Sequence, residues 1–203
     1  AVDGQRLTSW EEAIEHAIDI AEVDLGETGE TETSFALPAW REVQMVEGAG
    51  RVIKERWEIE GAVCLAVEDV PGPYPLRRLR VRIENRTGWD VPSTRREDGV
   101  RRSLVGVHVL LHGTNAVFLS SIDPPEFARG AVATCTNQNA FPVLIGPEGD
   151  HSTVLASPII LYDHPQVAAE SPGDMCDATE IDEILALRVL TLTDEEKLEA
   201  RAL

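Results

Sequence analysis

The sequence predicts a mainly β protein, an antiparallel β-sandwich or open barrel with short N- and C-terminal helices. Short apolar or alternating segments follow one another from residue 51 to residue 192, with turn residues between them and almost no helical periodicity. A length of 203 residues is enough for one sizeable domain that buries its own core. We therefore expect a β-rich domain over residues 34–192, an N-terminal helical arm and acidic linker over 1–33, and a C-terminal helix over 193–203.

The N-terminal arm is predicted from a capping box and an acidic stretch. Ser9 and Glu12 are spaced so that each side chain bonds a free backbone N–H at the start of a helix. Apolar residues then recur at helical spacing: Trp10, Ile14, Ala17, Ile18 and Ala21. This pattern predicts a helix over about residues 10–22. Residues 26–33 are polar and low in complexity, so they bury too little to repay their ordering entropy, and we expect a linker there.

The first strands are predicted from the alternation of apolar and charged residues. Ile53, Trp57 and Ile59 alternate with charged neighbours, and the apolar run after Gly61 predicts a buried strand. A proline-rich turn follows at 71–75. The clearest strand places Leu79, Val81 and Ile83 on one face and Arg78, Arg80, Arg82 and Glu84 on the other. That alternation predicts a sheet with one basic face in water.

The later elements are predicted from similar patterns. Asp123 before two prolines predicts the N-cap of a short helix. Thr193 and Glu196 form a second capping box, which opens the terminal helix. The segment 181–192 fits a helix or a strand, and alternation over 185–192 favours a strand. Strands are predicted at 104–111, 116–121, 141–145, 153–161 and 185–192, the first two joined as a hairpin through 112–115.

Charge and cysteine content narrow the class of partner. A formal net charge of −18 repels phosphate backbones and anionic lipids, so we expect neither nucleic-acid nor membrane binding. The charge is uneven, because residues 71–102 carry nine arginines against four acids. The three cysteines are far apart and include no Cys-x-x-Cys pair, so we expect reduced thiols. With no secretory signal and no apolar run of about 20 residues, the expected location is the cytoplasm.

The densest group of candidate ligands follows the apolar segment that begins at Ser157. Asp163 and His164 end that segment before Pro165, and the acidic stretch after it contains Glu170 and Asp174. Carboxylates with an imidazole alongside are ligands of a hard divalent cation, so we consider a metal site formed by Asp163, His164, Glu170 and Asp174. The alternative is that these acids cap turns and form a solvated face.

Two histidines and one cysteine are weaker candidates. His108 and His112 have the spacing of a helical ligand pair, but their β-branched surroundings predict a strand, on which they lie about 13 Å apart. His108 is then a hydrogen-bonded histidine of the core, or an acid or base if the protein is an enzyme. Cys135 lies among polar residues that favour a thiolate nucleophile, but no histidine is placed beside it by the sequence.

The C-terminal third carries a resemblance. The segments Ser-Pro-Ile-Ile-Leu-Tyr-Asp-His-Pro, Glu-Ser-Pro-Gly-Asp, Asp-Ala-Thr-Glu-Ile-Asp-Glu-Ile-Leu and Leu-Thr-Asp-Glu-Glu-Lys together resemble a C-terminal signature of a family of uncharacterised actinobacterial proteins. This resemblance implies a bacterial origin and assigns no activity and no catalytic residue.

Three functions fit these patterns. The first is an accessory or interaction protein that binds a protein partner, or itself, through segregated acidic and arginine-rich surfaces, the latter formed by Arg78, Arg80 and Arg82. The second is a hydrolase or lyase that uses a divalent metal ion, with His108 and His164 as acid or base. The third is a small-molecule-binding β-barrel with an apolar cavity facing Leu110 and Ile160.

Overall fold

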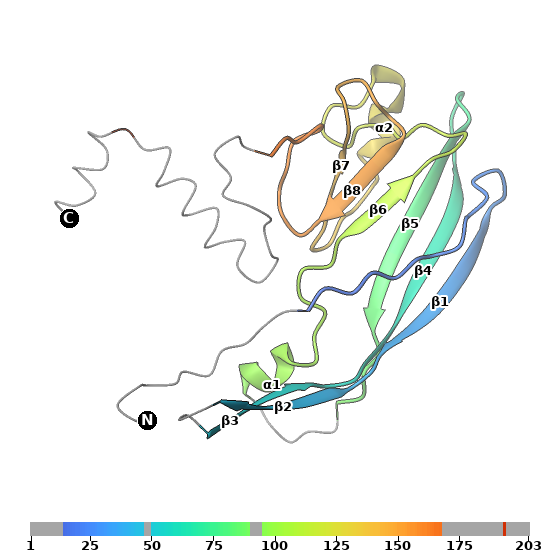
Figure 1. Cartoon of the computed structure of the whole chain (residues 1–203). Coiled ribbons are helices and arrows are strands. Elements are labelled where there is room, and N and C mark those ends of the chain that lie inside the picture. Colours follow the sequence, from blue (N-terminus) through green and yellow to red (C-terminus); the bar gives the residue numbers. More distant parts are fainter. Residues whose placement is uncertain (1–13, 47–49, 90–94, 168–192, 194–203) are drawn as a thin grey trace. The chain divides into compact units, whose positions relative to one another are not determined.

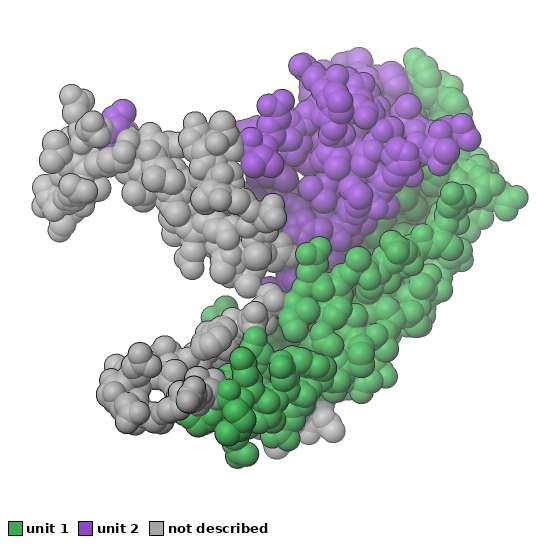
Figure 2. Space-filling model, viewed as in Figure 1, with its two compact units in different colours: residues 1–104 green, residues 105–203 purple. Residues whose placement is uncertain are grey.

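The computed structural model describes residues 14–46, 50–89, 95–167 and 193 (Figure 1). It divides into two compact units, residues 1–104 and residues 105–203, which are coloured separately in Figure 2. Each unit is described by itself below. Among the described residues, no helix has the length and apolar character needed to cross a membrane.

Unit 1 is built from five antiparallel strands in two sheets. β1 (Gly29–Leu37), β4 (Ile59–Val70) and β5 (Leu76–Asn85) form a three-stranded sheet in the order β1-β4-β5. β2 (Trp40–Val46) and β3 (Gly50–Arg56) form a two-stranded sheet, here called the hairpin arm. The mainly β, antiparallel prediction is confirmed, and neither sheet closes into a barrel.

One register runs through both sheets of unit 1. In β1 and β4 the last pair is Leu37 with Ile59, and in β2 and β3 the first pair is Trp40 with Arg56. Two residues separate the paired segments on each strand, so no residue is gained or lost between them. The ribbon in Figure 1 shows β1 leading into β2 and β3 leading into β4. The hairpin arm is therefore an extension of the β1 and β4 pair.

The two faces of the three-stranded sheet differ in chemistry. Val63, Leu65 and Val67 of β4 are buried on one face, where Leu79, Val81 and Ile83 of β5 lie beside them, as the sequence predicts. The other face has small residues on the central strand and long charged residues on both edge strands. On this face Ala62 is fully buried and Ala66 is 8% exposed. The basic residues of β5 project from this polar face.

Gly61 allows close packing at one end of the sheet. A Cβ added there would overlap the ring of Phe35 on β1 and come within 2.5 Å of the Glu84 carbonyl oxygen on β5. Phe35 is the cross-strand partner of Gly61, so its ring occupies the space that a side chain would fill. The glycine thus lets an aromatic ring cover the sheet at this point.

The segment after β5 folds back on unit 1. The Asn85 side chain donates to the Arg102 carbonyl oxygen at 2.6 Å, and α1 (Arg96–Val100) lies between them in sequence. The guanidinium of Arg101 lies 5.2 Å from the centre of the Trp57 ring, a cation–π contact. These contacts hold residues 95–104 against the end of the sheet.

Unit 2 is organised on one short antiparallel sheet. β6 (Val109–His112), β8 (Thr153–Ser157) and β7 (Phe141–Leu144) are arranged in the order β6-β8-β7. Val143, Leu144 and Val154 are its most buried apolar strand residues. A 3-10 turn, η1 (Glu126–Ala128), and one turn of helix, α2 (Arg129–Val132), precede β7 and bury Ala128.

Several expected elements differ from the structure. Residues 14–22 form no helix, and β1 includes residues 29–33 of the expected linker, because Glu and Thr alternate across a strand that pairs with β4. Residues 116–120 form no strand, because β6 pairs with β8 instead. Asp123 does not cap the turn that follows, whose N-cap is Pro125. The elements expected at 185–192 and in the C-terminal helix lie outside the described residues, apart from residue 193.

Candidate functional site

Asp163 holds two segments of unit 2 together. One carboxylate oxygen accepts the hydroxyl of Ser120 at 2.5 Å, and the other accepts the backbone N–H of Leu144 at 2.8 Å. The Ser120 hydroxyl oxygen also accepts the backbone N–H groups of Ile122 and Asp123, at 3.1 and 2.8 Å. Both oxygens of Asp163 therefore have partners in the fold, and both partners are distant in sequence.

His164 adopts a backbone conformation that the sequence does not predict. The following proline favours an extended backbone, yet φ of His164 is 55°, in the left-handed region. Its N–H donates to the Leu144 carbonyl oxygen at 2.7 Å, and its Nδ1 lies 3.2 Å from the Gly146 carbonyl oxygen. The backbone of His164 thus contacts the last residue of β7, and its ring contacts the turn after β7.

The metal prediction can be tested only in part. Asp163 and His164 lie within the structure, whereas Glu170 and Asp174 lie outside the described residues. Among residues 14–46, 50–89 and 95–167, no three His, Cys, Asp or Glu side chains come together as a metal site. The four-residue site stays a prediction.

The other candidate residues of unit 2 do not converge. His108 precedes β6 rather than lying inside a strand, and it is exposed, so the expected core position is wrong. Its Nδ1 lies 2.9 Å from the Gly106 carbonyl oxygen, while His112 at the far end of β6 contacts the Thr153 hydroxyl at 3.0 Å. Cys135 is exposed after α2. Leu110 and Ile160, expected to face an apolar cavity, are 65% and 76% exposed.

The arginines of β5 take part in ion pairs across the polar face. Arg80 contacts Glu68 at 2.8 Å, and Arg78 contacts the same carboxylate at 3.9 Å. Arg82 contacts Glu84 through Nε at 2.9 Å. Arg78, Arg80 and Arg82, the arginines expected to bind a partner, thus have carboxylates of the same sheet beside them. This surface is an ion-pair network rather than a basic patch.

A second set of contacts joins this network to β1. Arg86 donates to both oxygens of Glu32, at 2.6 and 2.7 Å, and contacts Glu84 at 2.7 Å. The Cys64 thiol on β4 donates to Glu32 at 3.5 Å. The hydrogen bonds from Arg86 lower the pKa of Glu32 to about 2, so this carboxylate stays ionised above that pH.

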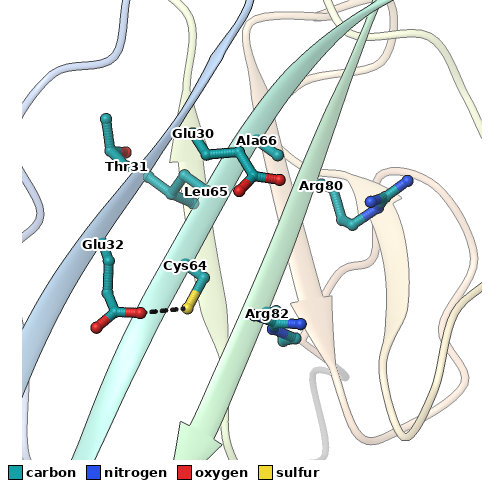
Figure 3. A pocket seen from close by; sticks show the side chains of 8 residues that line it. All are labelled: Glu30, Thr31, Glu32, Cys64, Leu65, Ala66, Arg80 and Arg82. Atoms are coloured by element: carbon teal, nitrogen blue, oxygen red, sulfur yellow. Dashed lines mark hydrogen bonds between the residues drawn. The ribbon is translucent and has the colours of Figure 1, made fainter.

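Between these groups lies a hollow of about 160 Å³, shown in Figure 3. Glu30 and Glu32 come from β1, and Arg80 and Arg82 come from β5. The remaining lining residues are uncharged: Thr31, Cys64, Leu65 and Ala66. Figure 3 shows the Glu30 carboxylate over β4 beside Ala66. We call this feature the polar-face hollow.

The hairpin arm carries the other distinctive surface of unit 1. Val43 faces Ile53 across the two strands, and their side chains are 50% and 39% exposed. Met45, two residues from Val43 on the same face, is 75% exposed. On this face Arg41 pairs with Glu55 at 3.0 Å, and Arg51 is the cross-strand neighbour of Met45. We call these six residues the arm face.

Sequence reasoning singled out Arg80 and Arg82 of the polar-face hollow but missed its β1 wall, and it missed the arm face altogether. Glu30 and Glu32 belong to a segment whose composition suggests a linker, and β2 has too mixed a pattern to be recognised alone. The alternation of Glu and Thr in residues 30–33 is the signal that predicts a strand, since threonine favours strands and alternate residues share a face.

Comparisons with known proteins add no relative. No protein-family model matches the chain, and neither a curated protein nor a solved structure shows a significant match. The resemblance of the C-terminal segments to actinobacterial proteins stays a prediction.

Proposed function

We propose that this protein is an interaction protein that self-associates, and that the arm faces of two copies pack on each other. The exposed apolar pair of Val43 and Ile53 supports the proposal. Because the register is unbroken, Val43 and Ile53 lie on the same face of the β-ribbon as Val63 and Leu65 of β4. Val63 and Leu65 are buried, whereas Val43 and Ile53 on the hairpin arm are exposed. The arm has only two strands, and a two-stranded segment is marginally stable without packing, so the arm of a second copy would supply a second layer that covers this apolar pair.

The arm face is complementary to itself under twofold symmetry. A twofold axis across the strands at the level of Val43 and Ile53 places each of these residues opposite its own copy. Arg51 and Glu55 lie two residues on either side of Ile53, so Arg51 of each copy meets Glu55 of the other. In an isologous interface both contacts form together.

The alternative axis, parallel to the strands, is less favourable. It places Glu55 opposite Arg41 of the second copy, and it places Arg51 opposite Met45. Glu55 already has Arg41 as a neighbour in its own chain, whereas no carboxylate pairs with Arg51 in the described part of the chain. The axis across the strands supplies Arg51 with a carboxylate and is the one that we propose.

Charge permits this contact in an acidic chain. The protein carries a formal charge of −18, which disfavours self-association through most surfaces. Strands β2 and β3 carry four basic side chains (Arg41, Arg51, Lys54 and Arg56) against two acidic ones (Glu42 and Glu55). Two arms therefore meet without the repulsion that other parts of the surface would produce.

The size of the arm sets the expected affinity. Strands of 7 residues are about 24 Å long, and two strands are about 10 Å wide, so one arm face covers about 240 Å². Two such faces bury about 500 Å², below the roughly 1,000 Å² of stable complexes. We expect a transient dimer with a Kd of about 100 µM.

The proposal is tested by sedimentation of charge-reversed variants. Arg51→Glu places two acids opposite each other in the dimer, and Glu55→Arg places two arginines opposite each other. Each variant alone should dimerise at least tenfold more weakly than the parent. An equimolar mixture of the two should dimerise again, because the glutamate introduced in one chain then meets the arginine introduced in the other.

Matched controls separate this effect from a general charge effect. Arg129→Glu changes the same charge on α2 of unit 2, outside the arm, and should dimerise as the parent does. The proposal fails if the parent stays monomeric up to about 1 mM, a concentration well above the expected Kd. It also fails if the mixture associates no better than its components.

A further inference from the structure

We propose that the polar-face hollow binds a small zwitterion of the amino-acid type, with its ammonium group on Glu30 and its carboxylate on Arg80 and Arg82. This site is separate from the arm face and does not depend on self-association. It rests on three observations: opposite charges on opposite walls, a floor of small residues, and ion pairs that hold the walls in place.

The β-sheet places the charges on two walls. Glu30 pairs with Ala66 and Glu32 pairs with Cys64, while Ala66 and Cys64 pair on their other side with Arg80 and Arg82. The acidic and basic residues therefore face each other across β4, two strand spacings or about 10 Å apart at the backbone. The central residues Ala66 and Cys64 are small, and the polar-face hollow lies beside them between the two walls.

The charge of the site selects the class of ligand. Around the hollow and its ion pairs stand four carboxylates and four guanidiniums: Glu30, Glu32, Glu68 and Glu84, with Arg78, Arg80, Arg82 and Arg86. A phosphate or other anion would meet the β1 carboxylates, and a metal ion would meet the β5 guanidiniums. A molecule that carries both charges matches both walls.

The ion pairs leave suitable groups for the ligand. Arg82 uses Nε for Glu84, and Arg80 uses one terminal nitrogen for Glu68, so each guanidinium retains other N–H donors. Within the described residues, Glu30 makes no ion pair and acts on Arg82 only through its charge, which helps to raise the pKa of that guanidinium, whereas Glu32 is held by Arg86. Glu30 is thus the carboxylate ready to accept an ammonium group, and Glu32 orders the wall beside it.

The volume sets the size of the ligand. The hollow of about 160 Å³ is smaller than the roughly 300 Å³ at which sites for drug-sized molecules and cofactors begin. No aromatic residue lines it, so no ring-stacking platform is present. Glycine, alanine and serine are of suitable size. Because the lining charges are partly exposed, the expected affinity is in the millimolar range.

The test is a titration of the full-length chain followed by the backbone amide signals of Cys64, Leu65 and Ala66 in NMR spectra. Glycine, L-alanine and L-serine are each added, together with N-acetyl-L-alanine, which lacks the ammonium group, and L-alaninamide, which lacks the carboxylate. We expect saturable shifts with at least one amino acid, and at least fivefold weaker binding of both blocked derivatives.

Two variants assign the contacts. Glu30→Gln removes the proposed ammonium partner without breaking an ion pair, so the sheet should remain folded, and amino-acid binding should weaken at least fivefold. Glu126→Gln removes a carboxylate from η1 in unit 2 and should bind as the parent does. The inference is overturned if none of the three amino acids causes saturable shifts, if a blocked derivative binds as tightly, or if Glu30→Gln binds like the parent.

Discussion

Replacing Asp163 by alanine should loosen the sheet of unit 2, because its carboxylate joins two segments that are distant in sequence. The change leaves the N–H of Leu144, a residue only 2% exposed, without its acceptor. An unsatisfied buried donor costs about 2 kcal/mol, and the lost bond from the Ser120 hydroxyl adds about 1 kcal/mol. We therefore expect unit 2 to lose about 3 kcal/mol of stability.

The assay must report on unit 2, since all four tryptophans lie in unit 1. Native-state hydrogen exchange at the Ile145 amide is suitable, because this N–H bonds the Thr153 carbonyl oxygen and does not contact Asp163. A loss of about 3 kcal/mol raises the equilibrium constant for opening, and with it the exchange rate of the Ile145 amide, about 100-fold. Asp163→Asn keeps an acceptor for Leu144 and should cost only about 1 kcal/mol.

Asp123→Ala is the matched control for this prediction. Asp123 is also an acid close to Ser120, but its recorded contact is made by its backbone N–H, which the substitution keeps. Its exchange rates should equal those of the parent. If Asp163→Ala changes the exchange rate at Ile145 by less than about threefold, the hydrogen bonds of Asp163 do not stabilise the sheet of unit 2. The same conclusion follows if Asp123→Ala changes the exchange rate as much as Asp163→Ala does.

Two further predictions concern unit 1. Gly61→Ala should destabilise the three-stranded sheet by about 2–3 kcal/mol, because the new methyl group overlaps the ring of Phe35. Gly29→Ala is the control, because its Cβ would enter open space, and it should leave the stability unchanged. The free energies of unfolding of both variants are compared by urea unfolding followed by tryptophan fluorescence. The depressed pKa of Glu32 contributes stability that is fully present above its ordinary pKa of 4.5 and is lost as the pH falls towards about 2. Arg86→Gln should raise the pKa of Glu32 towards 4.5, as followed by NMR titration of its side-chain carboxyl; a pKa that stays near 2 would show that Arg86 is not the cause.

The sequence predicts the elements whose signal is local. The alternation of β5 indicates both its strand and the composition of its faces, and the apolar run of β4 indicates a buried strand. The strands expected at 141–145 and 153–161 correspond to β7 and β8, and Gly146 and Gly149 between them have positive φ. In each case neighbouring residues alone carry enough information.

Elements that depend on a distant partner were not predictable in this way. The polar composition of β1 is like that of a linker. Its glutamates become recognisable as part of a strand only because Arg86 and the small residues of β4 lie beside them in the fold. The capping box at Ser9 and Glu12 predicts a helix, but Arg56 bonds the His16 ring at 2.9 Å, and residues 14–24 form no helix. The helix propensity of an isolated segment is a weak guide to its conformation in the fold.

The candidate sites show the same limit more strongly. The sequence singles out Asp163 and His164 as candidate metal ligands, but it does not reveal that both oxygens of Asp163 accept hydrogen bonds within the fold. The polar-face hollow requires three strands in register before its two walls exist. Pairings between residues more than thirty positions apart, such as Glu32 with Cys64, are not encoded in any local pattern.

The unbroken register of unit 1 restricts which length changes its gene can tolerate. A single residue inserted between Leu37 and Trp40 would shift β2 by one position against β3, and every side chain beyond it would change faces. Val43 and Met45 would then move to the opposite side of the ribbon from Ile53. Insertions and deletions here should therefore survive only as matched pairs, one in each strand, so that the arm lengthens or shortens while both of its faces are kept.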